Sequence, residues 1–136
     1  AGITIRHGFK DATGMAATIA SAHAGILTSE FEGMPRCVLE TLAIGRPVVA
    51  MHLPQLESVI HDDVSGYLVQ REGSLDDMAE MLTERFLAVR MDIANGRMQP
   101  EAVAASIETF TPGTQLARVY HYHQEIQKAR CPLVIA

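Results

Sequence analysis

Residues 25–50 read GILTSEFEGMPRCVLETLAIGRPVVA, and the fold prediction starts from them. Gly25–Thr28 is a short apolar run typical of a strand, and Pro35–Ile44 has the spacing of an amphipathic helix. Gly45 closes that helix, as a glycine just past the last turn commonly does. Pro47–Ala50 is an unbroken apolar run, which suits a strand buried on both faces of a parallel sheet. The segment predicts a strand–helix–strand unit.

Strand-like and helix-like segments alternate on both sides of this unit. Before it, we expect a strand at Ile3–Arg6 and a helix at Ala12–Ala22. After it, we expect a short helix near Gln55–His61 and a strand at Gly66–Val69. Strands that alternate with helices imply a mostly parallel sheet covered by helices on both faces. The predicted fold class is therefore α/β and Rossmann-like.

The rest of the chain is predicted to be helical. A helix capped by Ser74 has an apolar face made of Leu75, Met78, Ala79, Leu82 and Phe86. Asn95–Gly96 predicts a turn, and Pro100–Phe110 a further helix. Thr111-Pro112-Gly113 then breaks the chain before a closing helix at residues 114–130, whose apolar stripe is made of Leu116, Val119, Tyr120 and Ile126.

Length and charge bound the function. The 136 residues fit one domain, and a net charge of −5 without any basic run argues against nucleic-acid binding. No apolar run approaches the roughly twenty residues of a membrane span, and no leader pattern indicates export. Cys37 and Cys131 are too few for a disulfide framework, so we expect reduced thiols in a cytoplasmic protein, with Cys37 acting as a small hydrophobe.

Residues 29–40 carry the candidate chemistry. A predicted strand ends at Thr28, and a loop with Gly33 leads into a helix that has Pro35 near its first position. Ligands of open α/β sheets bind outside the carboxyl ends of the strands, where the N–H groups and dipole of a helix favour phosphate. Gly33 would let the backbone approach such an anion closely. The pattern predicts a diphosphate site at this helix start.

Two glutamates frame that predicted site. Glu32 precedes the helix, and Glu40 lies roughly one and a half turns into it. Carboxylates that accept hydrogen bonds from sugar hydroxyls form strong, charge-assisted contacts. The alternative is a chance pair, with Glu40 facing solvent. Glu40 lies between Leu39 and Leu42 in a segment expected to be buried, where a carboxylate is costly unless it is partnered.

The order of motifs resembles that of retaining glycosyltransferases of the GT-B fold, family four, which includes bacterial polysaccharide and lipopolysaccharide sugar transferases. Their signature has a Ser, a Glu-Gly pair, a second Glu after seven residues, and Gly-x-Pro-Val-Val. The matching residues here are Ser29, Glu32-Gly33, Glu40 and Gly45–Val49. Glu57–Ile60 is similar to the family's Glu-x-x-Ile, and Ser65–Val69 to its Asn-Gly-x-Leu-Val. With the helix after Ser74 and the closing helix, the resemblance covers nearly the whole chain.

The resemblance implies that residues 1–136 are part of a carboxyl-terminal donor-binding domain, with the first strands of that domain missing. It implies that Glu32 is catalytic and contacts the transferred sugar, and that Glu40 binds the ribose hydroxyls. Gly33, Met34 and Pro35 would offer backbone to the sugar or diphosphate. Gly8 and Phe9 would line the nucleobase pocket, although Phe9 also suits a core position.

The implied reaction is the retaining transfer of a hexosyl group from a nucleoside-diphosphate sugar to a carbohydrate or lipid-linked acceptor. The acceptor would bind to an amino-terminal domain absent here. The resemblance implies no metal or other cofactor, and a location in the cytoplasm or at the inner face of the membrane. The six histidines fit this expectation, because none pairs at ligand spacing beside a Cys or carboxylate cluster.

Departures from the family pattern keep alternatives open. Met34-Pro35 replaces the usual Phe, and His52–Gln55 replaces a glycine pair in the donor-facing loop. The family's Arg and Lys, which neutralise the leaving diphosphate, lie on the missing strand–helix unit. Charge stabilisation is usually the largest catalytic term, so this chain alone is not expected to catalyse transfer.

A non-catalytic nucleotide-binding module or one half of a split enzyme remains an alternative. The sequence marks of a sugar-nucleotide epimerase or a glycogen-phosphorylase-like relative are not seen around Glu32.

Overall fold

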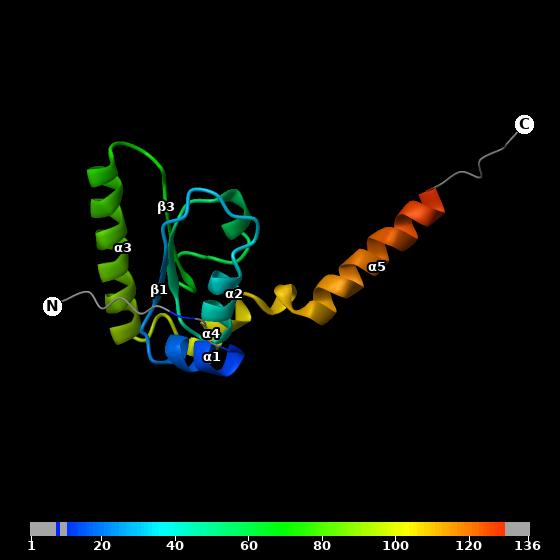
Figure 1. The fold of residues 1–136 in the computed structure, drawn as a ribbon, viewed down its shortest axis with the longest axis horizontal. Coiled ribbons are helices and arrows are strands. Elements are labelled where there is room, and N and C mark those ends of the chain that lie inside the picture. The colour runs from blue at the N-terminus through cyan, green and yellow to red at the C-terminus, as the bar shows by residue number, and fades with distance from the viewer. Residues whose placement is uncertain (1–7, 9–10, 130–136) are drawn as a thin grey trace, which may run out of the picture.

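A three-stranded parallel sheet lies at the centre of the computed structural model, which describes residue 8 and residues 11–129 (Figure 1). The strands are β1 (Gly25–Leu27), β2 (Val48–Met51) and β3 (Gly66–Val69), in the order β1-β2-β3. Both neighbours pair with β2 in parallel. The expected strand at Ile3–Arg6 lies outside the described residues. The predicted parallel α/β arrangement is confirmed.

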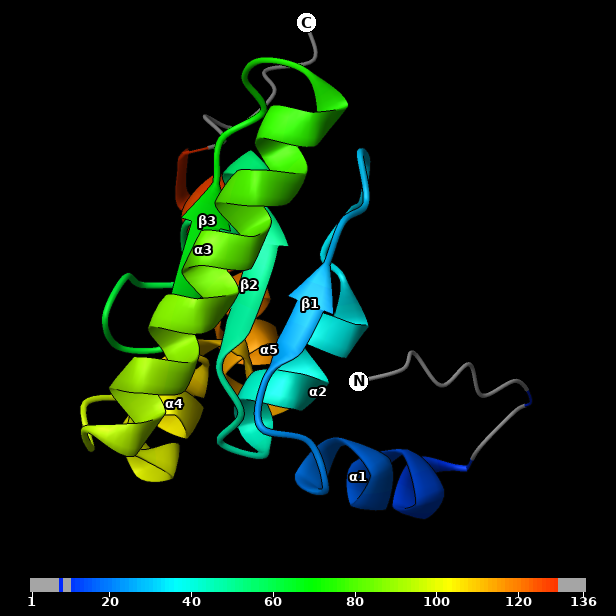
Figure 2. The ribbon, with the colours of Figure 1, turned by 90° about the vertical axis from the view of Figure 1, so that its left-hand side faces the viewer.

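Helices cover both faces of the sheet, as expected. The helix α3 (Leu75–Ala94) packs on β2 and β3 from one side, and α2 (Arg36–Ala43) packs on β1 and β2 from the other (Figure 2). The short helix α4 (Pro100–Ala105) lies against α2. In contrast, α1 (Ala12–Ala20) lies across the amino end of β1 and has no buried residue.

The middle strand supplies the centre of the core. All four residues of β2 are buried, as expected for a strand covered on both faces. The strand runs from Val48 to Met51, one residue later than predicted. The Pro47 carbonyl, just before it, accepts the Gly25 N–H of β1 at 2.9 Å. Val38 and Leu42 of α2 and Val89 of α3 are almost completely buried beside it.

The boundaries of several helices differ from the prediction, and α1 ends at Ala20 rather than Ala22. α2 begins at Arg36, and Pro35 is its N-cap with an extended backbone rather than its first helical residue. The helix expected at Gln55–His61 is a single 3-10 turn, η1 (Pro54–Leu56). Leu56, Val59 and Ile60 are all buried, and their i, i+3, i+4 spacing is that of one helical face, which is why the sequence pattern predicted a longer helix here. Gly45 ends α2 with a positive φ of 75°, as predicted.

The cap of α3 was predicted correctly, and its apolar face was predicted in part: Met78 and Leu82 pack against the core. The Ser74 hydroxyl accepts the Asp77 N–H, while the Asp77 carboxylate accepts the Ser74 N–H, so a capping box starts the helix. Leu75 is nevertheless 79% exposed and Phe86 40% exposed. α3 has 20 residues against four in β3, so the sheet covers only part of its length.

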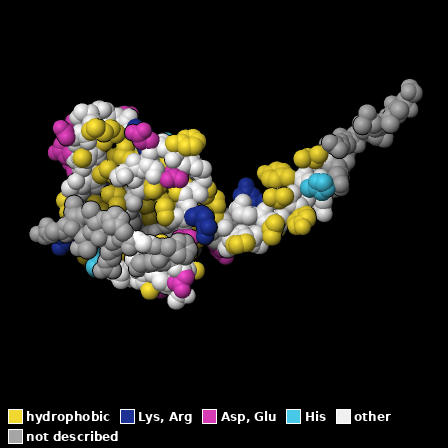
Figure 3. Space-filling model, in the orientation of Figure 1, with side chains coloured by type: hydrophobic (Ala, Val, Ile, Leu, Met, Phe, Trp, Pro, Cys, Tyr) yellow, Lys and Arg dark blue, Asp and Glu magenta, His cyan; other side chains and the backbone are white. Residues whose placement is uncertain are grey.

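The carboxyl-terminal part also departs from the prediction. The segment Pro100–Phe110 divides into α4 and a 3-10 turn, η2 (Glu108–Phe110). The closing helix α5 (Pro112–Ala129) begins at Pro112 and extends away from the sheet domain (Figure 1). Its predicted apolar stripe is exposed, and yellow side chains mark it in Figure 3. Helical periodicity predicts such a stripe, but it does not say what covers it.

Candidate functional site

The three strands point the same way, so the segments that follow them gather at one edge of the sheet (Figure 2). Residues 28–35 follow β1, His52 and η1 follow β2, and residues 70–74 follow β3. Two side-chain contacts join these segments. The Arg71 guanidinium donates to the Ser29 carbonyl, and the Gln55 amide nitrogen lies 2.6 Å from the Glu32 carbonyl oxygen. Both of the later segments therefore hold the 28–35 loop.

The loop leads into the amino end of α2. Pro35 is buried, and no described side chain caps the helix with a hydrogen bond. N–H groups of an uncapped first turn and the positive end of the helix dipole favour an anion. The candidate site is therefore the combination of this helix start with the loop before it, at the carboxyl edge of the sheet.

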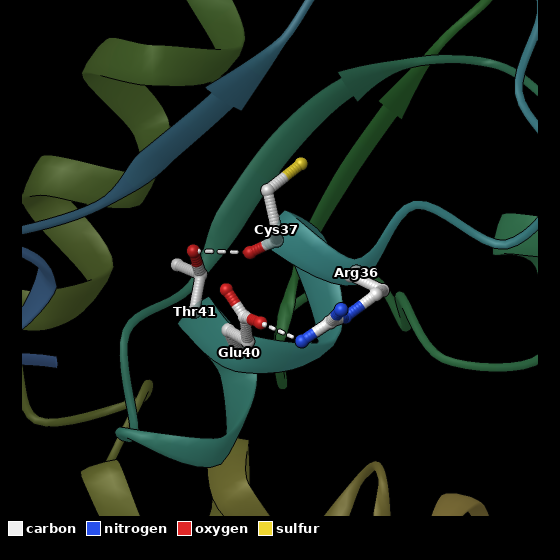
Figure 4. Close-up of polar contacts among 4 residues, drawn as sticks. All are labelled: Arg36, Cys37, Glu40 and Thr41. Carbon is white, nitrogen blue, oxygen red and sulfur yellow. Dashed lines mark hydrogen bonds and ion pairs between the residues drawn. The ribbon is translucent and has the colours of Figure 1, made fainter. Parts of the chain in front are cut away.

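Glu40 has a partner within α2. Its Oε1 lies 3.1 Å from Nη2 of Arg36, one turn earlier, and Figure 4 shows the two side chains pointing toward each other. The side chains of Arg36 and Glu40 are 88% and 41% exposed. Glu40 is thus neither an unpartnered buried carboxylate nor fully solvated. Its exposure leaves the carboxylate accessible from outside the helix.

A groove of about 590 Å³ lies beside Glu40, between α1 and α2. Its apolar wall comes mainly from α1, and its charged groups include Arg36 and Glu40 of α2. The Arg46 guanidinium donates to the Ala20 carbonyl at 2.7 Å, which ties the end of α1 to the turn after α2. This volume is within the range of small-molecule sites, roughly 300–1,000 Å³. No local sequence pattern predicts the groove, because its walls meet through contacts distant in sequence.

Cys37 occupies the second position of α2, between the two glutamates. The sequence favoured a small buried hydrophobe, but Cys37 is exposed, because α2 turns Val38 and Leu42 toward the core instead. Partial burial raises the pKa of the Cys37 thiol, and the charges of Glu32 and Glu40 raise this pKa further. The negative charges of both carboxylates therefore disfavour the thiolate form of Cys37, in the first turn of α2.

The comparison with known families decides the identity of this region. The sequence profile of the family called glycosyl transferases group 1 matches residues 2–86. The chain belongs to this family. The matched segment contains both glutamates and reaches into α3, and membership of this family supports a glycosyl transfer function. Comparisons with characterised proteins and with solved structures gave no significant match.

The remaining candidate residues of this glycosyltransferase differ in how exposed they are. Gly33 is exposed, and a Cβ built on it would meet no atom within 4 Å, so the backbone there is open to approach. Met34 is half-buried, and Pro35 is buried. Gly8 is exposed with a φ of 119° and would likewise meet nothing, so it adds no wall to the groove beside Glu40. Phe9 lies outside the described residues.

Two residues of the glycosyltransferase edge were not predicted as functional. Gln55 was noted only as part of the segment that replaces a glycine pair, and Arg71 was not singled out. The carbonyls that they bind are 23 and 42 residues away in sequence. The available signal was their position directly after strands, since the carboxyl ends of parallel strands meet at one edge.

Two further searches concern metals and membranes. Among the residues that the structure describes, no group of three or more His, Cys, Asp or Glu side chains could hold a metal ion. In the same part of this glycosyltransferase, no helix combines the length and apolar character that a bilayer crossing demands.

Proposed function

We propose that this chain binds the donor of a retaining hexosyl transfer, a nucleoside-diphosphate sugar. One observation carries the proposal. Glu32 lies in the loop before the uncapped first turn of α2, and Glu40 lies in the next turn of that helix, at the carboxyl edge of the sheet. An anion-binding helix start with one carboxylate before it and one after it suits a ligand that has a diphosphate between two hydroxyl-bearing rings.

Each part of the ligand has a proposed partner. The diphosphate lies on the helix start, with the backbone of Gly33, Met34 and Pro35 beside it. Glu32 contacts the transferred sugar as the catalytic residue, and Glu40 accepts the ribose hydroxyls. The openness of Gly33 and the exposure of Glu40 support these roles. We assign the nucleobase to Gly8 and Phe9.

The first test is calorimetric titration of the full-length protein with ADP, CDP, GDP, TDP and UDP. We expect one of them to bind, and Glu40→Ala to weaken that binding while Glu84→Ala on α3 does not. Binding should persist in EDTA, because the proposal includes no metal or other cofactor. The proposal would be overturned if the wild-type protein bound none of the five diphosphates.

A second test separates an enzyme from a binding module. The proposal places acceptor recognition, for a carbohydrate or lipid-linked acceptor, on a separate domain, in a cytoplasmic protein or one at the inner face of the membrane. Release of the diphosphate from the matching nucleotide sugar, measured with acceptor extracts, would support transfer. Tight donor binding without any turnover would favour a non-catalytic module or one half of a split enzyme.

A further inference from the structure

Glu32 lies in a loop whose residues on either side of it make few packing contacts. Its neighbour Phe31 is 88% exposed, and a Cβ built on Gly33, its other neighbour, would meet nothing within 4 Å. Within the described chain, the side chains that donate to this loop are Arg71 at Ser29 and Gln55 at Glu32. Arg71 holds the start of the loop, whereas Gln55 binds Glu32 itself.

Gln55 is well suited to hold another residue. It lies in η1, between Pro54 and the fully buried Leu56, and its own carbonyl accepts the Ser58 hydroxyl at 3.0 Å. Its Nε2 reaches the Glu32 carbonyl oxygen at 2.6 Å in a partly buried contact. A carbonyl only accepts hydrogen bonds, so the amide must present its nitrogen there. A rigid turn after β2 thus fixes the backbone of a residue after β1.

We infer that Gln55 is a positioning residue for Glu32, setting the direction of that carboxylate toward the sugar of the donor. The inference rests on the proposed function. A carboxylate that recognises hydroxyls must be held within a fraction of an ångström, and small displacements of such groups are costly. Gln55 does not touch the ligand in this account. It acts through the carbonyl of Glu32.

The position of Gln55 makes it a determinant of sugar recognition rather than of nucleotide binding. The diphosphate and ribose are assigned to α2 and Glu40, which make no hydrogen bond to Gln55 among the described residues. Loss of the Gln55 amide should therefore weaken binding of a nucleotide sugar and spare the nucleoside diphosphate. A change in general stability would weaken both ligands together.

The experiment compares Gln55→Ala and Gln55→Glu with the wild-type full-length protein. The probe pair is the nucleoside diphosphate that binds in the titration above and a nucleotide sugar of the same base, such as UDP with UDP-glucose or GDP with GDP-mannose. The measured quantity is the ratio of the two affinities within the pair. Gln55→Glu keeps the size of the side chain but removes its N–H donors. The matched control is Gln115→Ala, which removes another 2.6 Å amide-to-carbonyl bond, to Thr109, outside the sheet edge.

We expect both Gln55 variants to lose about fivefold in affinity for the nucleotide sugar, the worth of one net hydrogen bond. Affinity for the diphosphate should stay within about twofold, a few tenths of a kcal/mol, and Gln115→Ala should change neither. In the Glu32→Ala background, Gln55→Ala should have no further effect, because its partner's carboxylate is gone. Hydrogen exchange in residues 30–34 should increase in the Gln55 variants and not in the control.

Three results would overturn the inference. The first is an unchanged affinity ratio in Gln55→Ala when the wild type binds the sugar nucleotide. The second is an equal loss for both members of a pair, which indicates a structural role. The third is an additive effect with Glu32→Ala. If the wild type binds none of the five nucleoside diphosphates and none of the nucleotide sugars, the proposed function itself fails, and this inference fails with it.

Discussion

The Arg36 guanidinium reaches the Glu40 carboxylate across one turn of α2, at 3.1 Å. Both groups are well exposed, and such pairs contribute only about 0–1 kcal/mol to stability. The pair therefore orients Glu40 without burying it. A ligand hydroxyl can replace or join the guanidinium at little cost, so a role for Glu40 in binding can be separated from its role in stability.

The first prediction uses this separation. Glu40→Gln should change the free energy of unfolding by less than about 0.5 kcal/mol, because an exposed pair is weak. It should lower the affinity for the nucleoside diphosphate by about tenfold, the worth of a charge-assisted hydrogen bond. Urea denaturation and calorimetry measure the two quantities. Glu84→Gln on α3 is the control, and unchanged diphosphate affinity in Glu40→Gln would contradict the ribose assignment.

The second prediction concerns the reactivity of Cys37, studied in a Cys131→Ser background. Burial and the Glu32 and Glu40 charges raise its pKa, so less thiolate is present at pH 8 than in an unstructured peptide. Iodoacetamide should therefore modify Cys37 more slowly than a peptide cysteine. Glu32→Gln should accelerate the reaction, because removing a negative charge lowers the pKa of the thiol. A rate that stays constant or falls in Glu32→Gln would show that the two groups do not interact.

The fold could be predicted from the sequence where a local pattern has a local cause or where an apolar run is buried in the core. β2 is an unbroken apolar run, and all four of its residues are buried. The capping box of Ser74 and Asp77 is likewise a local pattern with a local cause. Burial of the helix faces could not be predicted in the same way. The stripe on α5 has helical spacing, yet Leu116 is 56% exposed, since periodicity specifies a face and not its neighbour.

The candidate site also has features that local sequence patterns predict and features that they do not. Glu32 and Glu40 could be found because they are eight residues apart around one helix start. The partner of Glu40 also lies four residues away, at a spacing that allows ion pairs, although the sequence analysis did not use it. The bond from Gln55 to Glu32 and the groove between α1 and α2 depend on how separate elements pack. Such contacts carry no local signal, so they became visible only in the structure.

The third prediction tests the close approach of β2 and β3. Gly66 has a φ of 149°, and a Cβ placed on it would lie 1.8 Å from the Val48 carbonyl oxygen. Backbone atoms of a buried strand cannot move away, so Gly66→Ala should abolish folding or cost more than about 4 kcal/mol. Circular dichroism during thermal denaturation measures the change.

Gly113→Ala provides the control for this substitution. Gly113 lies in α5, and an added Cβ would meet nothing there. Alanine should leave stability unchanged or raise it by up to about 1 kcal/mol, because it loses less entropy in a helix. A Gly66→Ala protein as stable as this control would show that β2 and β3 lie further apart than described.

The fourth prediction concerns the buried Tyr67 hydroxyl, which lies 2.6 Å from Oδ1 of Asp63 and 2.7 Å from Oδ2 of Asp92. Asp92 is almost completely buried and also pairs with Arg97. Tyr67→Phe removes one partner of this buried carboxylate. We expect the free energy of unfolding near pH 7 to fall by about 1–3 kcal/mol. Urea denaturation of the two proteins gives the difference.

The pH dependence of that difference provides a stricter test. Burial and the two carboxylates raise the pKa of Tyr67 above its ordinary value of about 10. The phenol then ionises in the unfolded chain before it does so in the folded one. Its contribution is complete below pH 10 and is lost as the pH rises further. The stability advantage of the wild type over Tyr67→Phe should therefore shrink between pH 10 and 11, and an advantage that grew over this range would place the tyrosine in an environment that favours its charged form.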